Sequence, residues 1–227
     1  MPYVKMTRVA ERIMTAKAAV YFWAAQKIKK IVIADATDSI LLKSNELSVF
    51  TDMGIAVEQL CYQQNEQLIK QKGKGYGEGE LISVALKNSV LLREHESFFK
   101  CTGKYCCQNF SDIAEMIKQH NFSNIFWRYY RSDLCFGPWT DTRFFYTTKD
   151  FAVHYLIPAY LKTDEQNGIM CELPVYNVLN DTMASAIMLK PKLHGFAGAS
   201  GELQVDASLG VLDVHYPCWM SYQEKGS

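Results

Sequence analysis

Short apolar strands alternate with helices over the first 130 residues, and this alternation most constrains the fold. Residues 7–30 have helical periodicity, and residues 31–34 follow as a fully apolar strand of the type buried in parallel sheets. Further strands are expected at residues 56–62, 97–100 and 124–130, and further helices at 81–92 and 111–120. This order predicts an α/β protein with a mainly parallel central sheet flanked by helices.

The sequence changes character after Tyr130. We expect a loop over residues 131–142, an aromatic strand over 143–148, and helices over 149–161 and 175–187. The tail from residue 191 is rich in glycine and aromatic residues. We therefore expect one compact domain, divided most weakly near Tyr130 into halves of residues 1–130 and 131–227.

Composition restricts the class of protein. The chain has 227 residues, is 48% hydrophobic and 21% charged, and has a formal net charge of zero. These values predict a globular protein and argue against a dedicated nucleic-acid binder, which needs a basic surplus. Seven cysteines without a Cys-x₂-Cys pair favour reduced thiols over a zinc site. With no signal peptide and no membrane-spanning apolar run, a cytoplasmic location is expected.

Two lysine-bearing stretches are candidates for binding phosphate. Residues 72–80 (KGKGYGEGE) supply Lys74, Gly75 and Glu78 in front of the helix expected at 81–92. Residues 99–105 (FKCTGKY) supply Thr102 and Lys104 in a tight turn. Glycines permit close approach of the backbone to a ligand, and a helix N-terminus attracts anions. Neither stretch has the spacing of a standard phosphate loop, so a solvated loop and an ordinary turn are the alternatives.

Two further residues are candidates for contacting the same ligand. Asp35 ends the first apolar strand, at the edge where open α/β sheets bind ligands. Its alternative role is in turn or cap chemistry. His194 precedes the glycine-rich residues 195–201 and could contact a phosphate, or could simply be packed.

Four stretches together resemble one family. They are the opening helix with Arg12 running into residues 31–39, residues 73–80, residues 99–105, and residues 191–201. Their order is similar to that in bacterial glycosyltransferases with a GT-A-like sheet, which build capsule, lipopolysaccharide or lipooligosaccharide. The resemblance implies a nucleotide-sugar donor bound by residues 1–130 and a glycan or glycolipid acceptor bound by residues 131–227. It leaves open a peripheral association with the inner membrane.

The chain departs from this family at the metal site. GT-A enzymes typically carry Asp-x-Asp at the end of a central strand, whereas the strand at 97–100 leads to Thr102-Gly103-Lys104. Lys104, with Lys74 or Lys100, would neutralise the leaving phosphate instead. We therefore expect no metal and no separate cofactor.

Glycosyl transfer with inversion also needs a base that accepts the proton of the acceptor hydroxyl. Asp133, Asp141 and Glu172 qualify in the second half of the chain, and we favour Asp141 or Glu172. Asp141 precedes Arg143 and could instead form a structural salt bridge. Glu172 lies between an apolar run and Pro174, and burial there would raise its pKa towards that of a useful base.

Three classes of function therefore compete. The first is a metal-independent glycosyltransferase acting on a cell-surface glycan. The second is a non-catalytic nucleotide- or glycan-binding subunit of a polysaccharide synthase. The third is another nucleotide-dependent enzyme, such as a nucleotidyltransferase, which would need clustered acidic metal ligands that the sequence does not supply.

Overall fold

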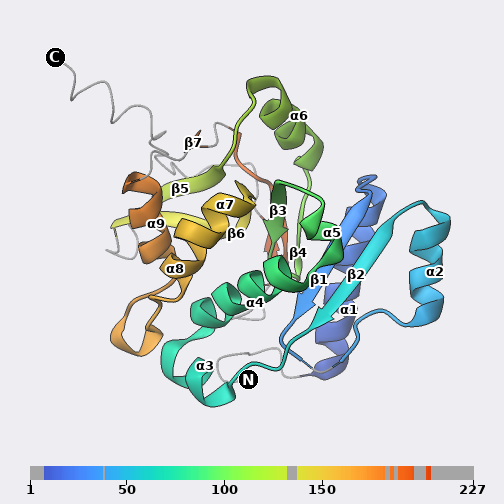
Figure 1. The fold of residues 1–227 in the computed structure, drawn as a ribbon, viewed down its shortest axis with the longest axis horizontal. Helices are drawn as coiled ribbons and strands as arrows, with labels where there is room; N and C mark the ends of the chain where they lie inside the picture. Colours follow the sequence, from blue (N-terminus) through green and yellow to red (C-terminus); the bar gives the residue numbers. More distant parts are fainter. Residues whose placement is uncertain are drawn as a thin grey trace.

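The computed structural model describes residues 8–37, 39–131, 137–181, 185–186, 189–196 and 203–205. They form a mixed α/β structure in which helices surround three small sheets (Figure 1). The helices are α1 (Val9–Ala25), α2 (Ser44–Asp52), α3 (Glu66–Lys72), α4 (Lys74–Asn88), α5 (Val90–Arg93), α6 (Phe110–His120), α7 (Lys149–Phe151), α8 (Ile157–Tyr160) and α9 (Glu172–Asp181). The strands are β1 (Lys30–Asp35), β2 (Ala56–Cys61), β3 (Ser97–Cys101), β4 (Tyr105–Cys107), β5 (Ile125–Arg131), β6 (Gly137–Thr148), β7 (Ser185–Ala186), β8 (Leu193–Phe196) and β9 (Leu203–Val205).

The N-terminal part contains a β–α–β unit. β1 and β2 pair in parallel, and α2 supplies the crossover that parallel neighbours require. The core between these strands and helices α1 and α2 is built from Val20, Ala24, Leu42, Phe50 and Ile55. The strands predicted at residues 31–34 and 56–62 are confirmed. The first helix ends at Ala25, earlier than predicted, because Lys27 has a left-handed backbone with φ of 60°.

The largest sheet has the order β3-β6-β5-β7. Phe144 and Phe145 of β6 point to opposite faces, since successive strand residues alternate, and each belongs to a separate hydrophobic core. Helices α4, α8 and α9 supply residues to the Phe145 core, and α6 supplies the Phe144 core. Trp23 of α1 stacks on Phe144 and thereby joins the N-terminal unit to this sheet.

The mainly parallel central sheet that we predicted is not formed by the described residues. Parallel pairing is limited there to β1–β2 and β5–β7, and β6 runs antiparallel to both β3 and β5. The reason lies in residues 131–142, which we expected to be a loop. From Gly137 onward they belong to β6. A short connection from β5 can only return the chain antiparallel, and β6 then occupies the place between β3 and β5.

The glycine-lysine stretch is helical rather than a loop, which corrects the prediction for residues 72–80. α3 ends at Lys72, and α4 begins at Lys74 after Gly73, whose φ is 102°. A Cβ atom on Gly75 would lie 2.5 Å from the Cβ of Cys171, and one on Gly79 would lie 2.4 Å from the Cβ of Tyr160. These two glycines, one turn apart, therefore let α4 pack against α8 and the start of α9.

Between β6 and the short strands β7 to β9, the described chain is largely helical. The helix predicted over 149–161 is present as α7, a π-helical turn (Ala152–Leu156) and α8. The helix predicted over 175–187 begins earlier, at Glu172, and ends at Asp181. β8 lies between β4 and β9 in a third, antiparallel sheet. Residues 197–202 of the predicted glycine-rich turn lie outside the described residues. Within the described chain, no helix combines the length and apolar character needed to cross a membrane.

Candidate functional site

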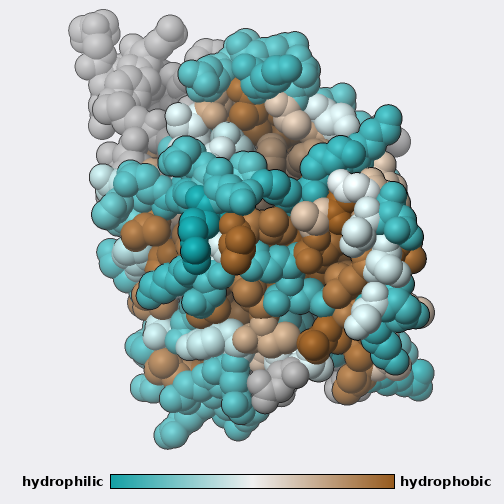
Figure 2. Space-filling model, turned by 45° about the vertical axis from the view of Figure 1, so that its right-hand side comes forward, coloured by the Kyte–Doolittle hydropathy of each residue, from teal (hydrophilic) through white to brown (hydrophobic). Residues whose placement is uncertain are grey.

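One large cavity collects most of the predicted site residues. It has a volume of about 1930 Å³ and is bounded by α1, β1, α4, β3 and β6. Hydrophobic side chains reach the surface in the middle of the face shown in Figure 2, between hydrophilic ones. Eight of the nine predicted residues line the cavity: Asp35, Lys74, Gly75, Glu78, Thr102, Lys104, Asp141 and Glu172. His194 is not among the lining residues; it lies in β8, paired with Cys106 of β4.

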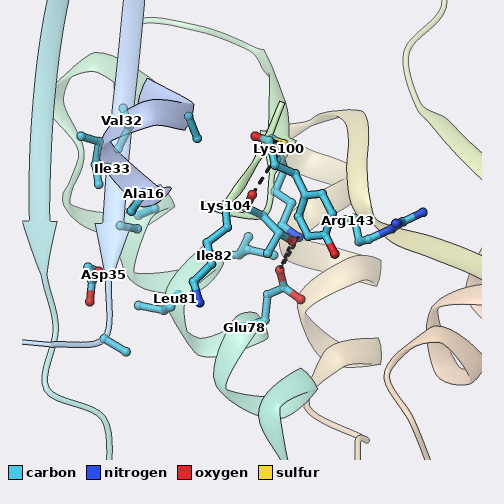
Figure 3. Close-up of a pocket in the computed structure, with 18 of the residues that line it drawn as sticks. Ala16, Val32, Ile33, Asp35, Glu78, Leu81, Ile82, Lys100, Lys104 and Arg143 are labelled. Atoms are coloured by element: carbon cyan, nitrogen blue, oxygen red, sulfur yellow. Dashed lines mark hydrogen bonds and ion pairs between the residues drawn. The ribbon is translucent and has the colours of Figure 1, made fainter. Parts of the chain in front are cut away.

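Lys104 reaches into this cavity from the turn between β3 and β4. Its amino group points into the space between β1, which carries Asp35, and α4 (Figure 3). Burial lowers the pKa of Lys104, and the positive charges of Arg12 and Lys74 lower it further. Burial also lowers the pKa of Lys74, while the Glu165 carboxylate partly opposes that change. Half-buried Lys104 therefore lies where an additional anion would be favoured, whereas Lys74 already has the Glu165 carboxylate nearby.

Arg12 is a cavity residue that the sequence analysis did not select as a site residue. It lines the cavity together with Val9, Ala16, Ala19 and Trp23 of α1. These positions recur at steps of three and four, so Arg12 belongs to the inward-facing stripe of the helix. A charged residue within an apolar stripe was the available signal in the sequence.

The N-terminus of α4 already has an anionic partner. The backbone N–H of Gly75 donates a hydrogen bond of 3.0 Å to Oε1 of Glu165. A carboxylate at this place is stabilised by the helix dipole. The predicted contact between a ligand phosphate and the Gly75 backbone therefore competes with a side chain of the protein itself.

One part of the cavity wall is a hydrogen-bonded cluster of three side chains, Lys100, Glu78 and Thr102. The ammonium group of Lys100 bonds to the Glu78 carboxylate, to Oγ1 of Thr102 at 2.8 Å and to the carbonyl of Thr142 at 2.6 Å (Figure 3). Oγ1 of Thr102 in turn donates to Glu78 at 3.0 Å. An ammonium group has three protons, and all three of those on Lys100 have acceptors here. Lys100 is thus a structural residue of the cavity, whereas donor binding by Glu78 and Thr102 stays a prediction.

Asp141 is engaged by Arg143. Its Oδ1 accepts hydrogen bonds from the backbone N–H and Nε of Arg143, and its Oδ2 accepts one from Nη2 at 2.6 Å. Its side chain is only 5% exposed. Arg143 also donates to Gln204 of β9, which accepts a second hydrogen bond from Tyr105. These contacts match the structural alternative stated for Asp141 and leave its carboxylate poorly placed to accept a proton.

Glu172 is the other predicted base, at the first residue of α9. Burial raises its pKa, and the negative charges of Glu78 and Asp141 add to that effect. The thiol of Cys171, 3.3 Å away, donates to Oε2 of Glu172. A carboxylate with a raised pKa that lines a cavity is well suited to general base chemistry near neutral pH.

Asp35 ends β1 at the cavity edge, as predicted. Its Oδ1 accepts a hydrogen bond of 2.8 Å from the backbone N–H of Thr37, which is the turn chemistry proposed as its alternative role. The second carboxylate oxygen is not needed for this turn. Asp35 can thus hold the turn and still present an acceptor to a ligand hydroxyl.

Across the described residues, no group of three or more His, Cys, Asp or Glu side chains is arranged to hold a metal ion. Neither a protein-family model nor a curated protein matches the chain. The arguments about function therefore depend on the residues of the cavity and on the resemblance described above.

Proposed function

We propose that this protein is a glycosyltransferase that moves a sugar from a nucleotide-sugar donor to a bacterial capsule- or lipopolysaccharide-type glycan. The observation that carries the proposal is one cavity lined by Lys74 and Lys104 and by a half-buried carboxylate with a raised pKa, Glu172. Transfer of a sugar needs both kinds of group: cations for the departing phosphate and a base for the acceptor hydroxyl.

The first part of the proposal concerns the donor. The parallel pair β1–β2 with its α2 crossover supports a GT-A-like start of the chain, and Asp35 ends β1 at the expected ligand edge. We assign Asp35 to a hydroxyl of the nucleoside and the two lysines to its phosphates. The other sheets, which include β3, β4 and β5 of the same half, are mostly antiparallel, so the proposed likeness to GT-A enzymes is restricted to the β1–α2–β2 unit.

The second part concerns the reaction. The acceptor oxygen bonds to the anomeric carbon while the bond from that carbon to the phosphate oxygen breaks. Glu172 takes the proton of the acceptor hydroxyl, and the electron pair of the broken bond leaves with the phosphate, close to Lys104. Because the lysines offset the charge of the leaving group, the proposal needs no metal ion.

The size of the cavity supports simultaneous binding of two substrates. Pockets for a single small ligand measure about 300–1,000 Å³, and this cavity has a volume of about 1930 Å³. A nucleotide-sugar would fill part of it and leave room for the sugar unit of an acceptor.

The proposal is tested by turnover of nucleotide-sugars in the presence of EDTA. Release of nucleotide should be detected from one donor among UDP-, GDP-, CMP-, ADP- and dTDP-sugars. Glu172→Gln should lower kcat by about 10²–10⁴, the usual effect of removing a general base. The matched control is Glu115→Gln, on the exposed side of α6 and away from the cavity.

Three outcomes would change the conclusion. Full activity in folded Glu172→Gln would remove the proposed base. Nucleotide binding without turnover of any donor would favour the alternative, a non-catalytic nucleotide- or glycan-binding subunit of a polysaccharide synthase. Strict dependence on Mg²⁺ would favour a metal-dependent nucleotide enzyme.

A further inference from the structure

Cys171 is a buried thiol in the wall of the cavity, beside the proposed base Glu172. It is only 7% exposed, and it directly precedes α9. Its sulfur lies 3.3 Å from Oε2 of Glu172 and 3.8 Å from Oγ1 of Thr142. The thiol therefore links a carboxylate at the start of α9 to a side chain of β6.

The direction of these two contacts follows from the chemistry of the groups. Burial raises the pKa of Cys171 well above its usual value, and the negative charges of Glu172 and Glu78 raise it further. The thiol therefore keeps its proton near neutral pH and donates it to Glu172, because a carboxylate can only accept. With that proton engaged, the hydroxyl of Thr142 is the donor of the second contact and the sulfur is its acceptor.

Both Cys171 and Thr142 are held in place by other parts of the fold. Gly75 lets α4 lie directly against Cys171, since a Cβ atom on this glycine would lie 2.5 Å from the Cβ of Cys171 and 2.9 Å from its sulfur. Thr142 is 5% exposed, and its carbonyl oxygen accepts the hydrogen bond of 2.6 Å from Lys100. The position of the thiol is therefore determined by α4 and β6, independently of Glu172.

We infer that Cys171 is a positioning residue for Glu172: its thiol holds Oε2 and thereby leaves Oε1 to receive the proton of the acceptor hydroxyl. The inference deepens the proposed function and rests on it for the role of Glu172 as a base. The thiol keeps its own proton throughout the reaction. A glutamate side chain has several rotamers, and a fixed donor at one oxygen selects among them. A thiol suits this task because it is a weak donor, whereas a strong donor would stabilise the carboxylate and make it a poorer base.

Other charged and titratable groups also surround Glu172. On the elements packed around α9 they are Glu78 with its partner Lys100, Asp141 with its partner Arg143, and the buried phenol of Tyr160. The two carboxylates add to the raised pKa of Glu172, which burial causes in the first place. Cys171→Ala leaves all of these groups in the chain, so a change in the pKa of Glu172 in that variant reports the loss of the thiol.

Removal of the thiol should change two measurable properties of Glu172. A hydrogen bond donated to a carboxylate favours its charged form, so the pKa of Glu172 should rise in Cys171→Ala. In the same variant kcat should fall about 3- to 10-fold, the usual effect of losing one hydrogen bond, while KM for the donor stays the same. Cys171→Ser keeps a donor, so its kcat should lie closer to wild type and the pKa of Glu172 should not rise.

The experiment follows the glutamate carboxyl groups by carbon NMR during a pH titration, together with kcat and KM in EDTA. The signal of Glu172 is identified by its absence in Glu172→Gln. Cys107→Ala is the matched control, because this thiol is also buried, donates to Oδ1 of Asn109 at 3.3 Å, and is not among the cavity-lining residues. A thiol that only fills space would lower the melting temperature in Cys171→Ala without moving the pKa of Glu172.

Several results would overturn the inference. These are an unchanged pKa of Glu172 in folded Cys171→Ala, an equal rise in Cys171→Ser, or an equal loss of kcat in Cys107→Ala. Should Cys171→Ala fail to fold, Thr142→Val removes the donor to the sulfur at similar volume, and an unchanged pKa of Glu172 there would count against the inference. Turnover separates the two proposals. Inactive wild-type protein would overturn the transferase, whereas an active wild type with unaltered kcat in Cys171→Ala would overturn only the positioning role.

Discussion

Replacement of Gly79 by alanine tests whether the glycines of residues 73–80 serve packing or phosphate binding. A Cβ atom on Gly79 would lie 2.4 Å from the Cβ of Tyr160 and 3.3 Å from its Cγ. Tyr160 is fully buried in the core against α4, and its Cβ belongs to the rigid start of the side chain. The clash cannot be relieved by rotating a side chain, so α4 and α8 would have to separate.

The magnitude follows from two opposing terms. Alanine in place of glycine inside a helix contributes about 1 kcal/mol of stability. Overpacking a tight core contact costs about 1–3 kcal/mol, and a contact this short belongs at the upper end. The expected result is a net loss of about 2 kcal/mol, or about 4–8 °C in Tm for a chain of this length. Thermal unfolding followed by circular dichroism measures it.

Gly103→Ala is the matched control. No heavy atom lies within 4 Å of the position that its Cβ would take. Its Tm should therefore change by no more than about 2 °C, as is usual for exposed substitutions. A Gly79→Ala protein that melts at or above the wild-type temperature would refute the packing role, and the loop originally predicted for residues 72–80 would have to be reconsidered.

Three further predictions concern charged groups. Lys100→Met leaves the Glu78 carboxylate without its cation and should lower the free energy of unfolding by about 3–5 kcal/mol. The double variant Lys100→Met/Glu78→Gln should recover part of this free energy, measured by denaturant unfolding. Burial by itself would raise the pKa of Glu58, but hydrogen bonds from Ser89 and from the start of α5 lower it, and the net pKa is below 4.5. The stability that the charged Glu58 contributes should therefore be lost as pH falls below 4.5. Tm profiles of wild type and Glu58→Gln should converge at low pH. The pKa of Glu172 is raised from 4.5, so its stabilising effect is present below that pH and lost as pH rises; Glu172→Gln should melt above wild type at pH 8 and level with it at pH 4.

Local patterns predicted the elements whose formation depends on near neighbours. The apolar run at residues 31–34 became β1, and the strands expected at 97–100 and 124–130 became β3 and β5. Asp35 was placed correctly at the end of β1, because a strand of four apolar residues ends where polar residues begin. The lysine turn with Lys104 was also found, since a tight turn between two strands carries its own glycine signal.

Other predictions failed because the deciding partner lies far away in the sequence. Residues 73–80 contain enough glycine to predict a loop, yet Tyr160 and Cys171 press against Gly79 and Gly75 and favour a tightly packed helix. β6 was expected to begin near residue 143, but pairing with β5 extends the strand back to Gly137. Propensity is a weak influence, and tertiary contacts of this kind override it.

The sequence by itself determined which residue types are offered for the proposed chemistry: it supplied Lys74, Lys104 and Glu172 as the cations and the carboxylate of the proposed transferase site. Only the tertiary structure decided which neighbours each candidate residue of the site has. In the folded chain, the ammonium group of Lys100 has three hydrogen-bond acceptors, and the Asp141 carboxylate is paired with Arg143. The charge of Arg12 from α1 acts on Lys104 and lowers its pKa. The physical reason is that a charged group's role depends on its burial and on the charges within a few ångströms, which come from segments far apart in the chain.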